Sequence, residues 1–248
     1  MIRMIIVIFV NSIRFIYLLP LMRKMTKHPE KYSEEQCYRL ARHLVRTMKV
    51  TGAIRTKAFG LENLPNEGGY MMYPNHQGKY DVYGIVSAHD KPCTVVIDKD
   101  KSYYPFVSEL VELLHAKRLD KNDVRQGLTV INQVAKEVKA GRRYILFPEG
   151  KYVTRNKNKM SEFKKGCFKI SLMSKTPIVP VALVNSYKVF NGVSLPTIVK
   201  TQVHFLEPIP YEEYKDMKTY EISDLVKSRI QEKLEEVVKK RKLRNDVM

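Results

Sequence analysis

The chain has 248 residues, a hydrophobic content of 44% and a formal net charge of +18. This length allows one sizeable domain with an appendage and a packed core. The three widely spaced cysteines argue against a disulfide framework and for a reducing compartment, and no cysteine or histidine cluster has the spacing of metal ligands. So large a basic excess indicates an anionic partner: nucleic acid, an anionic membrane or a phosphorylated substrate.

The first predicted element is a strongly apolar helix over residues 1–22. A transmembrane helix needs about 20 apolar residues with few charges, whereas a signal peptide needs a small-residue cleavage site, which the next residues do not supply. On a helix, Arg3, Asn11 and Arg14 fall on one stripe, with Val7 between them. We expect a helix lying in one leaflet of a membrane, with a tilted single span as the alternative.

A second helix is predicted to open at Ser33, which forms a capping box with Gln36. Apolar residues recur at helical spacing along one side: Cys37, Leu40, Ala41, Leu44, Val45 and Met48. The other side is basic: Arg39, Arg42, His43, Arg46 and Lys49. This pattern suits an anionic lipid surface, and an amphipathic helix packed on the domain is the alternative. Residues 1–50 are therefore interpreted as a two-helix membrane-association arm.

The rest of the chain, residues 51–248, alternates short apolar runs with helical patterns, which predicts an α/β domain with a central, mainly parallel sheet flanked by helices. The predicted strands cover residues 53–59, 69–74, 94–98, 143–148, 178–184 and 201–206. The predicted helices cover residues 81–88, 105–114, 124–139, 162–174 and 220–242.

Three polar loops follow predicted strands, and loops at the carboxyl ends of parallel strands are where α/β proteins place their chemistry. The first is NHQGKYD, residues 75–81; the second is RLDKND, residues 118–123; the third is FPEGKY, residues 147–152. If the three strands run parallel, these loops share one edge of the sheet.

The first loop contains a possible general base. A histidine titrates near neutral pH and works better as a base when a carboxylate holds one ring nitrogen as a donor. His76 and Asp81 are five residues apart, which would point them in different directions within one helix. We therefore expect His76 in the turn before a helix and Asp81 in its first turn, with Gly78 making that turn easier.

The chain resembles the glycerolipid acyltransferases, and most of all the lysophosphatidic acid acyltransferases. Four blocks carry the resemblance in order: Asn75-His76 with Asp81; Leu119-Asp120-Lys121; Phe147-Pro148-Glu149-Gly150 followed by Phe163-Lys164-Lys165-Gly166; and the proline-centred strand at residues 177–182. The resemblance covers about residues 70–185 and implies transfer of a fatty acyl group to the sn-2 hydroxyl of lysophosphatidic acid.

The resemblance also implies roles for individual residues. His76 would take the proton from the acceptor hydroxyl and Asp81 would orient it. The implied substrate-binding residues are Arg118, Lys121, Glu149, Gly150 and Arg155. The cations among them would hold the phosphate; Glu149 would bind a glycerol hydroxyl or hold a cationic side chain, with a structural loop carboxylate as the alternative.

The implied partners are an acyl donor, a lysophospholipid acceptor and anionic membrane lipids. The donor would be acyl-CoA or acyl-carrier protein, with no other cofactor and no metal. The catalytic domain would lie on the cytoplasmic side of the membrane. Nucleic acid is not expected, because the sequence has no recognition motif of a known class. Two alternatives stay open: another acceptor, such as glycerol 3-phosphate or a different lysophospholipid, and a non-catalytic basic membrane-binding protein.

Overall fold

A computed structural model describes residues 2–191 and 195–246. Its strands are β1 (Ile54–Phe59), β2 (Tyr70–Pro74), β3 (Thr94–Asp98), β4 (Lys117–Leu119), β5 (Arg143–Ile145), β6 (Ile178–Val184) and β7 (Val199–Phe205). They form one sheet in the order β1-β7-β6-β2-β5-β3-β4. All neighbouring strands are parallel except β6 and β7, which are antiparallel. The mainly parallel α/β sheet predicted from the sequence is thus confirmed.

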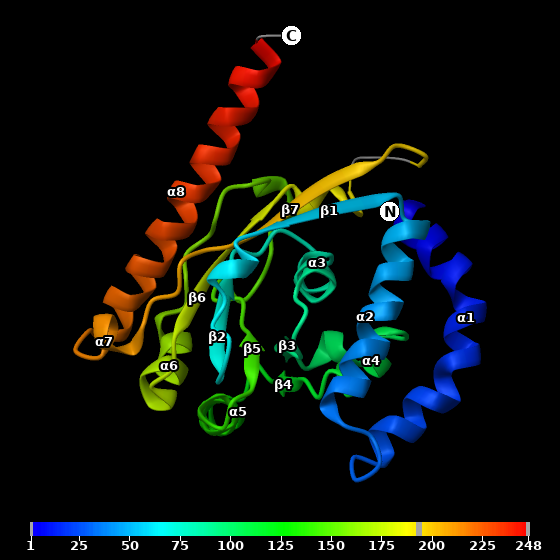
Figure 1. The fold of residues 1–248 in the computed structure, drawn as a ribbon, viewed down its shortest axis with the longest axis horizontal. Helices are drawn as coiled ribbons and strands as arrows, with labels where there is room; N and C mark the ends of the chain where they lie inside the picture. Colours follow the sequence, from blue (N-terminus) through cyan, green and yellow to red (C-terminus); the bar gives the residue numbers. More distant parts are fainter. Residues whose placement is uncertain (1, 192–194, 247–248) are drawn as a thin grey trace.

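Helices cover both faces of this sheet (Figure 1). They are α1 (Ile2–Lys27), α2 (Glu34–Thr51), α3 (Asp81–Ala88), α4 (Val107–Leu113), α5 (Val124–Lys139), α6 (Lys169–Ser174), α7 (Tyr211–Tyr214) and α8 (Thr219–Asp246). Buried side chains of α1 to α4 share one core with one face of the sheet, and those of α5 to α8 share a second core with the other face.

Strand β2, which precedes the first loop, is covered on both faces of the sheet. All five residues of β2 are buried. Tyr70 and Met72 face the core under α1 to α4, whereas Met71 and Tyr73 face the core under α5 to α8, as the two-residue period of a strand requires. Continuous apolar runs are typical of parallel strands covered on both faces. Burial of the strand fixes where the polar loop after Pro74 begins.

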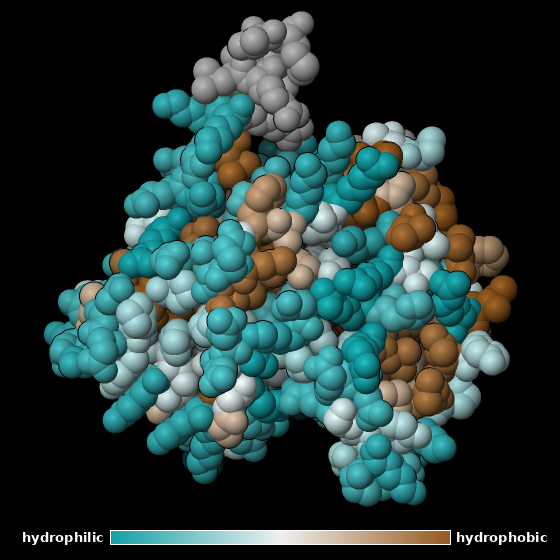
Figure 2. Space-filling view, viewed as in Figure 1, coloured by the Kyte–Doolittle hydropathy of each residue, from teal (hydrophilic) through white to brown (hydrophobic). Residues whose placement is uncertain are grey.

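Helix α1 packs lengthwise on the domain while leaving a wide apolar face outside. Phe15 packs edge-on against Phe106, with 4.4 Å between the ring centroids. Near the other end, Arg3 is 2% exposed; its guanidinium donates to the carbonyl of Thr197 at 2.7 Å and also to that of Gly52. The outer face carries exposed apolar residues: Ile2, Ile5, Phe9, Val10, Ile13, Ile16 and Tyr17. Figure 2 shows hydrophobic surface on the side of the molecule where α1 lies.

The two predicted helices of the arm are both present, but the apolar side of the second helix faces the core instead of lying exposed. Ser33 caps α2 in the predicted capping box. The apolar stripe of α2 is buried, with Cys37, Ala41, Leu44 and Val45 packed in the core beneath α1. The expectation that this stripe faces lipid is therefore wrong, and the exposed apolar face belongs to α1. By length and composition α1 could cross a membrane.

A buried histidine in this fold makes stability depend on pH. His89 is fully buried at the end of α3; it donates from Nδ1 to the carbonyl of Lys91 at 2.6 Å and accepts at Nε2 from the Tyr70 hydroxyl at 2.7 Å. Burial lowers the pKa of His89 from 6.5 to about 4. The unfolded chain therefore binds more protons than the folded chain between these values. The contribution of His89 is fully present above pH 6.5 and is lost as the pH falls toward 4.

As the pH falls from 6.5 to 4, we expect protonation linked to His89 to lower the free energy of unfolding by about 3 kcal/mol. The measurement is denaturant unfolding in detergent at pH 7 and pH 5, for the wild type and a His89→Gln variant. Between pH 7 and pH 5, the free energy of unfolding of the wild type should fall by about 2 kcal/mol more than that of the variant. Equal losses in the two proteins would show that His89 is not kept neutral by burial.

Candidate active site

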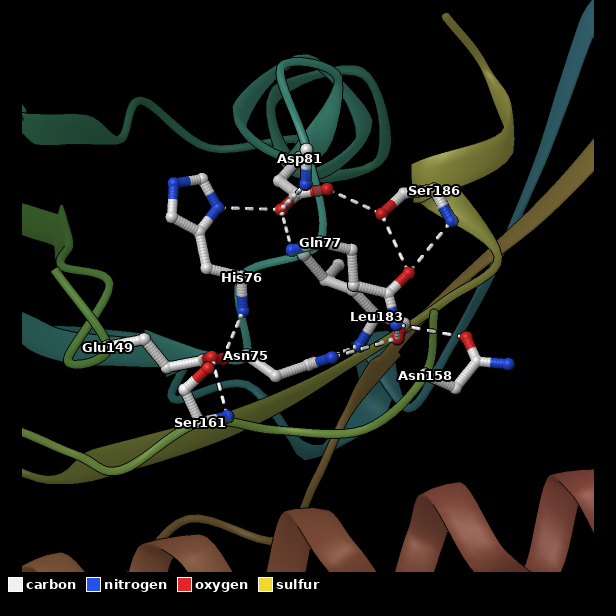
Figure 3. A network of polar contacts seen from close by, with 10 residues as sticks. Asn75, His76, Gln77, Asp81, Glu149, Asn158, Ser161, Leu183 and Ser186 are labelled. Carbon is white, nitrogen blue, oxygen red and sulfur yellow. Dashed lines mark hydrogen bonds and ion pairs between the residues drawn. The ribbon is translucent and has the colours of Figure 1, made fainter. Parts of the chain in front are cut away.

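The first loop is fixed to the sheet by an asparagine that acts like a backbone group. The side chain of Asn75 donates to the carbonyl of Leu183 at 3.1 Å and accepts from its N–H at 2.7 Å. Leu183 lies on β6, which pairs with β2 as far as Pro74. The side chain therefore continues the pairing one residue beyond the strand, and it sets the position of His76 at the carboxyl end of the sheet (Figure 3).

His76 and Asp81 meet across the turn, as their spacing predicts. Nδ1 of His76 lies 2.7 Å from Oδ2 of Asp81, whose side chain is completely buried in the first turn of α3. The same oxygen accepts the backbone N–H groups of Gln77 at 2.5 Å and Gly78 at 2.9 Å. Because an ionised carboxylate can only accept, Nδ1 carries the hydrogen and Nε2 carries the free lone pair. The second ring nitrogen points away from Asp81 in Figure 3.

The turn does not use the conformational freedom of Gly78, which was expected to make it easier. Gly78 is not among the residues with positive φ. A Cβ added to it would meet only the Cα of Tyr187, at an ordinary contact distance of 3.7 Å. The turn is held instead by the two N–H groups that converge on Asp81, since each bond to a charged oxygen is stronger than a neutral one.

The imidazole lies between two aromatic rings. Phe147 stacks on it with 4.1 Å between ring centroids, and Tyr152 meets it edge-on at 4.9 Å. The ammonium of Lys101 lies 5.2 Å from the centroid of the Tyr152 ring. Burial, followed by the negative charge of Asp81, raises the pKa of Tyr152. With 17% of its side chain exposed, His76 is enclosed but accessible.

Glu149 ties the third loop to the first. One carboxylate oxygen accepts the N–H of His76 at 2.6 Å, and the other accepts the N–H of Ser161 at 2.8 Å. The side chain is 5% exposed, and burial raises its pKa although both hydrogen bonds oppose the rise. These partners favour the structural loop carboxylate, because both oxygens hold protein backbone in place.

Comparison with known proteins decides the family. The acyltransferase family model matches residues 55–184, which include both His76 and Glu149. The chain belongs to the acyltransferase family.

Named relatives and a solved structure agree with this membership. The chain is 30% identical over 206 residues to a 1-acyl-sn-glycerol-3-phosphate acyltransferase of Saccharomyces cerevisiae, covering 79% of this chain and 65% of the relative. It is 26% identical over 178 residues to the human alpha form, covering 70% and 62%. It thus spans somewhat less than two thirds of these relatives. Its fold matches that of a crystal structure of PlsC, the 1-acyl-sn-glycerophosphate acyltransferase of Thermotoga maritima, with a TM-score of 0.78, 17% identity and 95% of each chain covered.

The second loop is separated from the His76 loop by two intervening strands. The strands before the three loops are parallel, so the loops do share an edge, but β5 and β3 separate β4 from β2. Three strand spacings amount to about 14 Å. Arg118 donates to Glu112 at 2.6 Å, and Lys121 pairs with Asp98 at 2.6 Å. In the structure, both cations are thus engaged with acidic side chains.

The two remaining residues that were predicted to bind substrate, Gly150 and Arg155, lie in or after the third loop. Gly150 has a φ of +68°, a backbone conformation that favours glycine, whereas the nearest atoms to an added Cβ belong to the flexible end of Lys164. Arg155 is exposed in a short 3₁₀ helix, Thr154–Asn156. Their roles in substrate binding stay predictions. Across residues 2–191 and 195–246, no group of three or more His, Cys, Asp or Glu side chains is placed to hold a metal ion.

The structure adds site residues that the sequence did not indicate. Gln77 accepts at its side-chain oxygen from the N–H of Ser186 at 3.0 Å, and donates to Leu183 at 2.8 Å and to Asn158 at 3.0 Å. Ser186 also donates its hydroxyl to Asp81. These contacts join residues more than 80 positions apart, so no local sequence motif could have revealed them.

Proposed function

We propose that this chain transfers a fatty acyl group from acyl-CoA or acyl-carrier protein to the sn-2 hydroxyl of lysophosphatidic acid, giving phosphatidic acid. The observation that carries the proposal is the imidazole of His76, held at Nδ1 by a buried carboxylate and open at Nε2 at the carboxyl edge of the sheet. The names of the relatives support the choice of acceptor, and the family supports the reaction class.

In the proposed step, Nε2 of His76 takes the proton of the sn-2 hydroxyl while the hydroxyl oxygen attacks the carbonyl carbon of the thioester. The new C–O bond forms, the C–S bond breaks, and the imidazolium returns the proton to the leaving thiolate. Asp81 stabilises the imidazolium that exists between the two transfers. General-base assistance of this kind contributes about 10²–10⁴-fold to a rate. No covalent acyl-enzyme is required.

The acceptor's phosphate needs cations near this base. Arg155 is exposed, whereas Arg118 and Lys121 would first have to leave Glu112 and Asp98. Lys101 is a further cation, beside a tyrosine that touches His76. We therefore place the headgroup on the side of the imidazole that faces Tyr152.

We also propose that α1 lies within one leaflet, with the catalytic domain on the cytoplasmic side. Arg3 and Phe15 hold α1 lengthwise against the domain, so a span across the bilayer would have to break these contacts. The outward face, which includes Phe9 and Ile13, is apolar along much of the helix, as an interfacial helix requires. The net charge of +18 favours an anionic surface and acidic acyl donors.

The acceptor is tested with purified protein in detergent and a labelled acyl group on either CoA or acyl-carrier protein. Lysophosphatidic acid, glycerol 3-phosphate and lysophosphatidylcholine are offered separately. We expect lysophosphatidic acid to react fastest. A faster reaction with glycerol 3-phosphate or lysophosphatidylcholine would replace the proposed acceptor, and failure with every acceptor would leave the non-catalytic membrane binder.

The position of α1 is tested by flotation with vesicles that contain anionic lipid. A Phe9→Ser, Ile13→Ser double variant removes two exposed apolar side chains and should reduce the bound fraction at least severalfold. A Val124→Ser variant serves as the control, because Val124 is equally exposed but lies at the start of α5. Unchanged flotation of the double variant would contradict the interfacial arrangement.

A further inference from the structure

Asp81 is held by a hydroxyl from a distant part of the chain. The Ser186 hydroxyl donates to Oδ1 of Asp81, the oxygen that His76 does not use. Ser186 is 4% exposed and lies directly after Asn185, which follows the last residue of β6 and has a left-handed φ of 63°. Its own N–H donates to the side-chain oxygen of Gln77 at 3.0 Å. The serine is therefore fixed at both its backbone and its side chain (Figure 3).

The two carboxylate oxygens of Asp81 accept different numbers of hydrogen bonds. Oδ2 receives three donors, from His76, Gln77 and Gly78. For Oδ1, within the part of the chain that the structure describes, the hydroxyl of Ser186 is the one donor found. A buried carboxylate oxygen that loses its donor carries a large desolvation penalty. Without Ser186, the carboxylate would be free to rotate about its Cβ–Cγ bond or to admit water.

Rotation of that carboxylate would change the orientation of the His76 ring, which is bonded to it. The ring is held by one hydrogen bond to Oδ2 and by contact with two aromatic rings, so its tilt follows the carboxylate plane. A hydrogen bond at the far oxygen also spreads the negative charge of the carboxylate over both oxygens. Ser186 is thus placed to control both the orientation of the imidazole and the strength of its bond to Asp81.

We infer that Ser186 is a positioning residue for the acyl-transfer reaction, acting through the carboxylate of Asp81 on the imidazole of His76. The inference rests on the proposed function. It extends the His76–Asp81 pair to a third side chain that enters from the end of β6, and Ser186 itself is buried.

The test compares Ser186→Ala with Ser186→Thr, which keeps the hydroxyl. Loss of a hydrogen bond to a charged group corresponds to about a 10- to 100-fold effect. We expect that loss in kcat for Ser186→Ala, with KM changed less than about threefold, and substantial recovery of kcat in Ser186→Thr. A second readout is the Nδ1–H proton resonance of His76, assigned by its disappearance in His76→Gln. It should shift in Ser186→Ala and return in Ser186→Thr.

Ser174→Ala is the matched control, because Ser174 is also a buried serine but bonds Ser171 and Thr176 in the opposite half of the core. Its kcat and its Nδ1–H resonance should match those of the wild type. Wild-type kcat with an unmoved resonance in Ser186→Ala overturns the inference, as does an equal loss of kcat in both alanine variants with the resonance unmoved. If the wild type transfers no acyl group, the proposed function fails, while the resonance still reports whether Ser186 acts on His76.

Discussion

Replacing His76 by alanine is expected to lower acyl transfer by about 10²–10⁴-fold, because the variant has no group to take the proton of the acceptor hydroxyl. The loss should fall on kcat, since in the proposed mechanism the imidazole acts on the reacting oxygen rather than on the headgroup. The measurement is single-turnover transfer from labelled acyl-CoA to lysophosphatidic acid. Binding to anionic vesicles should be unchanged, because α1 lies outside the His76 turn.

A matched control for this experiment is His115→Asn. His115 stands at the opposite end of the sheet, in the turn before β4, and has a φ of +49°. Asparagine tolerates that backbone conformation better than alanine does. This variant should transfer acyl groups at the wild-type rate. If His76→Ala also kept that rate, the general-base assignment would fail while the fold and family would stand.

The second large effect is expected from Asp81→Asn, which removes the charge but can keep the geometry. The N–H groups of Gln77 and Gly78 both point at one side-chain oxygen, so the asparagine amide should turn its oxygen toward them. That oxygen still accepts from Nδ1 of His76, and the amide nitrogen faces the Ser186 hydroxyl, which can accept. The neutral amide cannot stabilise an imidazolium, and we expect kcat to fall about 10²-fold.

This substitution separates the charge of Asp81 from its role in orientation. Thermal stability should change little, and the His76 Nδ1–H resonance should persist while moving upfield. In Asp81→Ala the resonance should be lost and kcat should fall further. A wild-type kcat in Asp81→Asn would mean that the negative charge takes no part in the rate-limiting step.

The sequence predicted the elements that carry strong periodicity. The bounds of α3, α5, β3 and β6 match the structure residue for residue, because clear caps or buried apolar runs define them. No bounds were predicted for the short elements β4 and α7, since three or four residues are too few to show a period. The helix predicted over residues 162–174 begins as a 3₁₀ turn and becomes α-helical only at Lys169.

The site was predictable only where it is local in the chain. The contact between His76 and Asp81 follows from their spacing and from the turn between them. The order of strands in space cannot be read from the chain, so the sequence could not show that β3 and β5 stand between β4 and β2. The backbone partners of Glu149 were hidden for the same reason.

The pairing of Asn75 with Leu183 has a consequence for how such an enzyme can diversify. Because the Asn75 side chain extends the β2–β6 pairing by one residue, the position of His76 depends on the register of two buried strands. The segment Asp100–Phe106 supplies none of the bonds that hold the imidazole. Changes in residues 100–105 can therefore leave His76 in place, because the sheet sets its position.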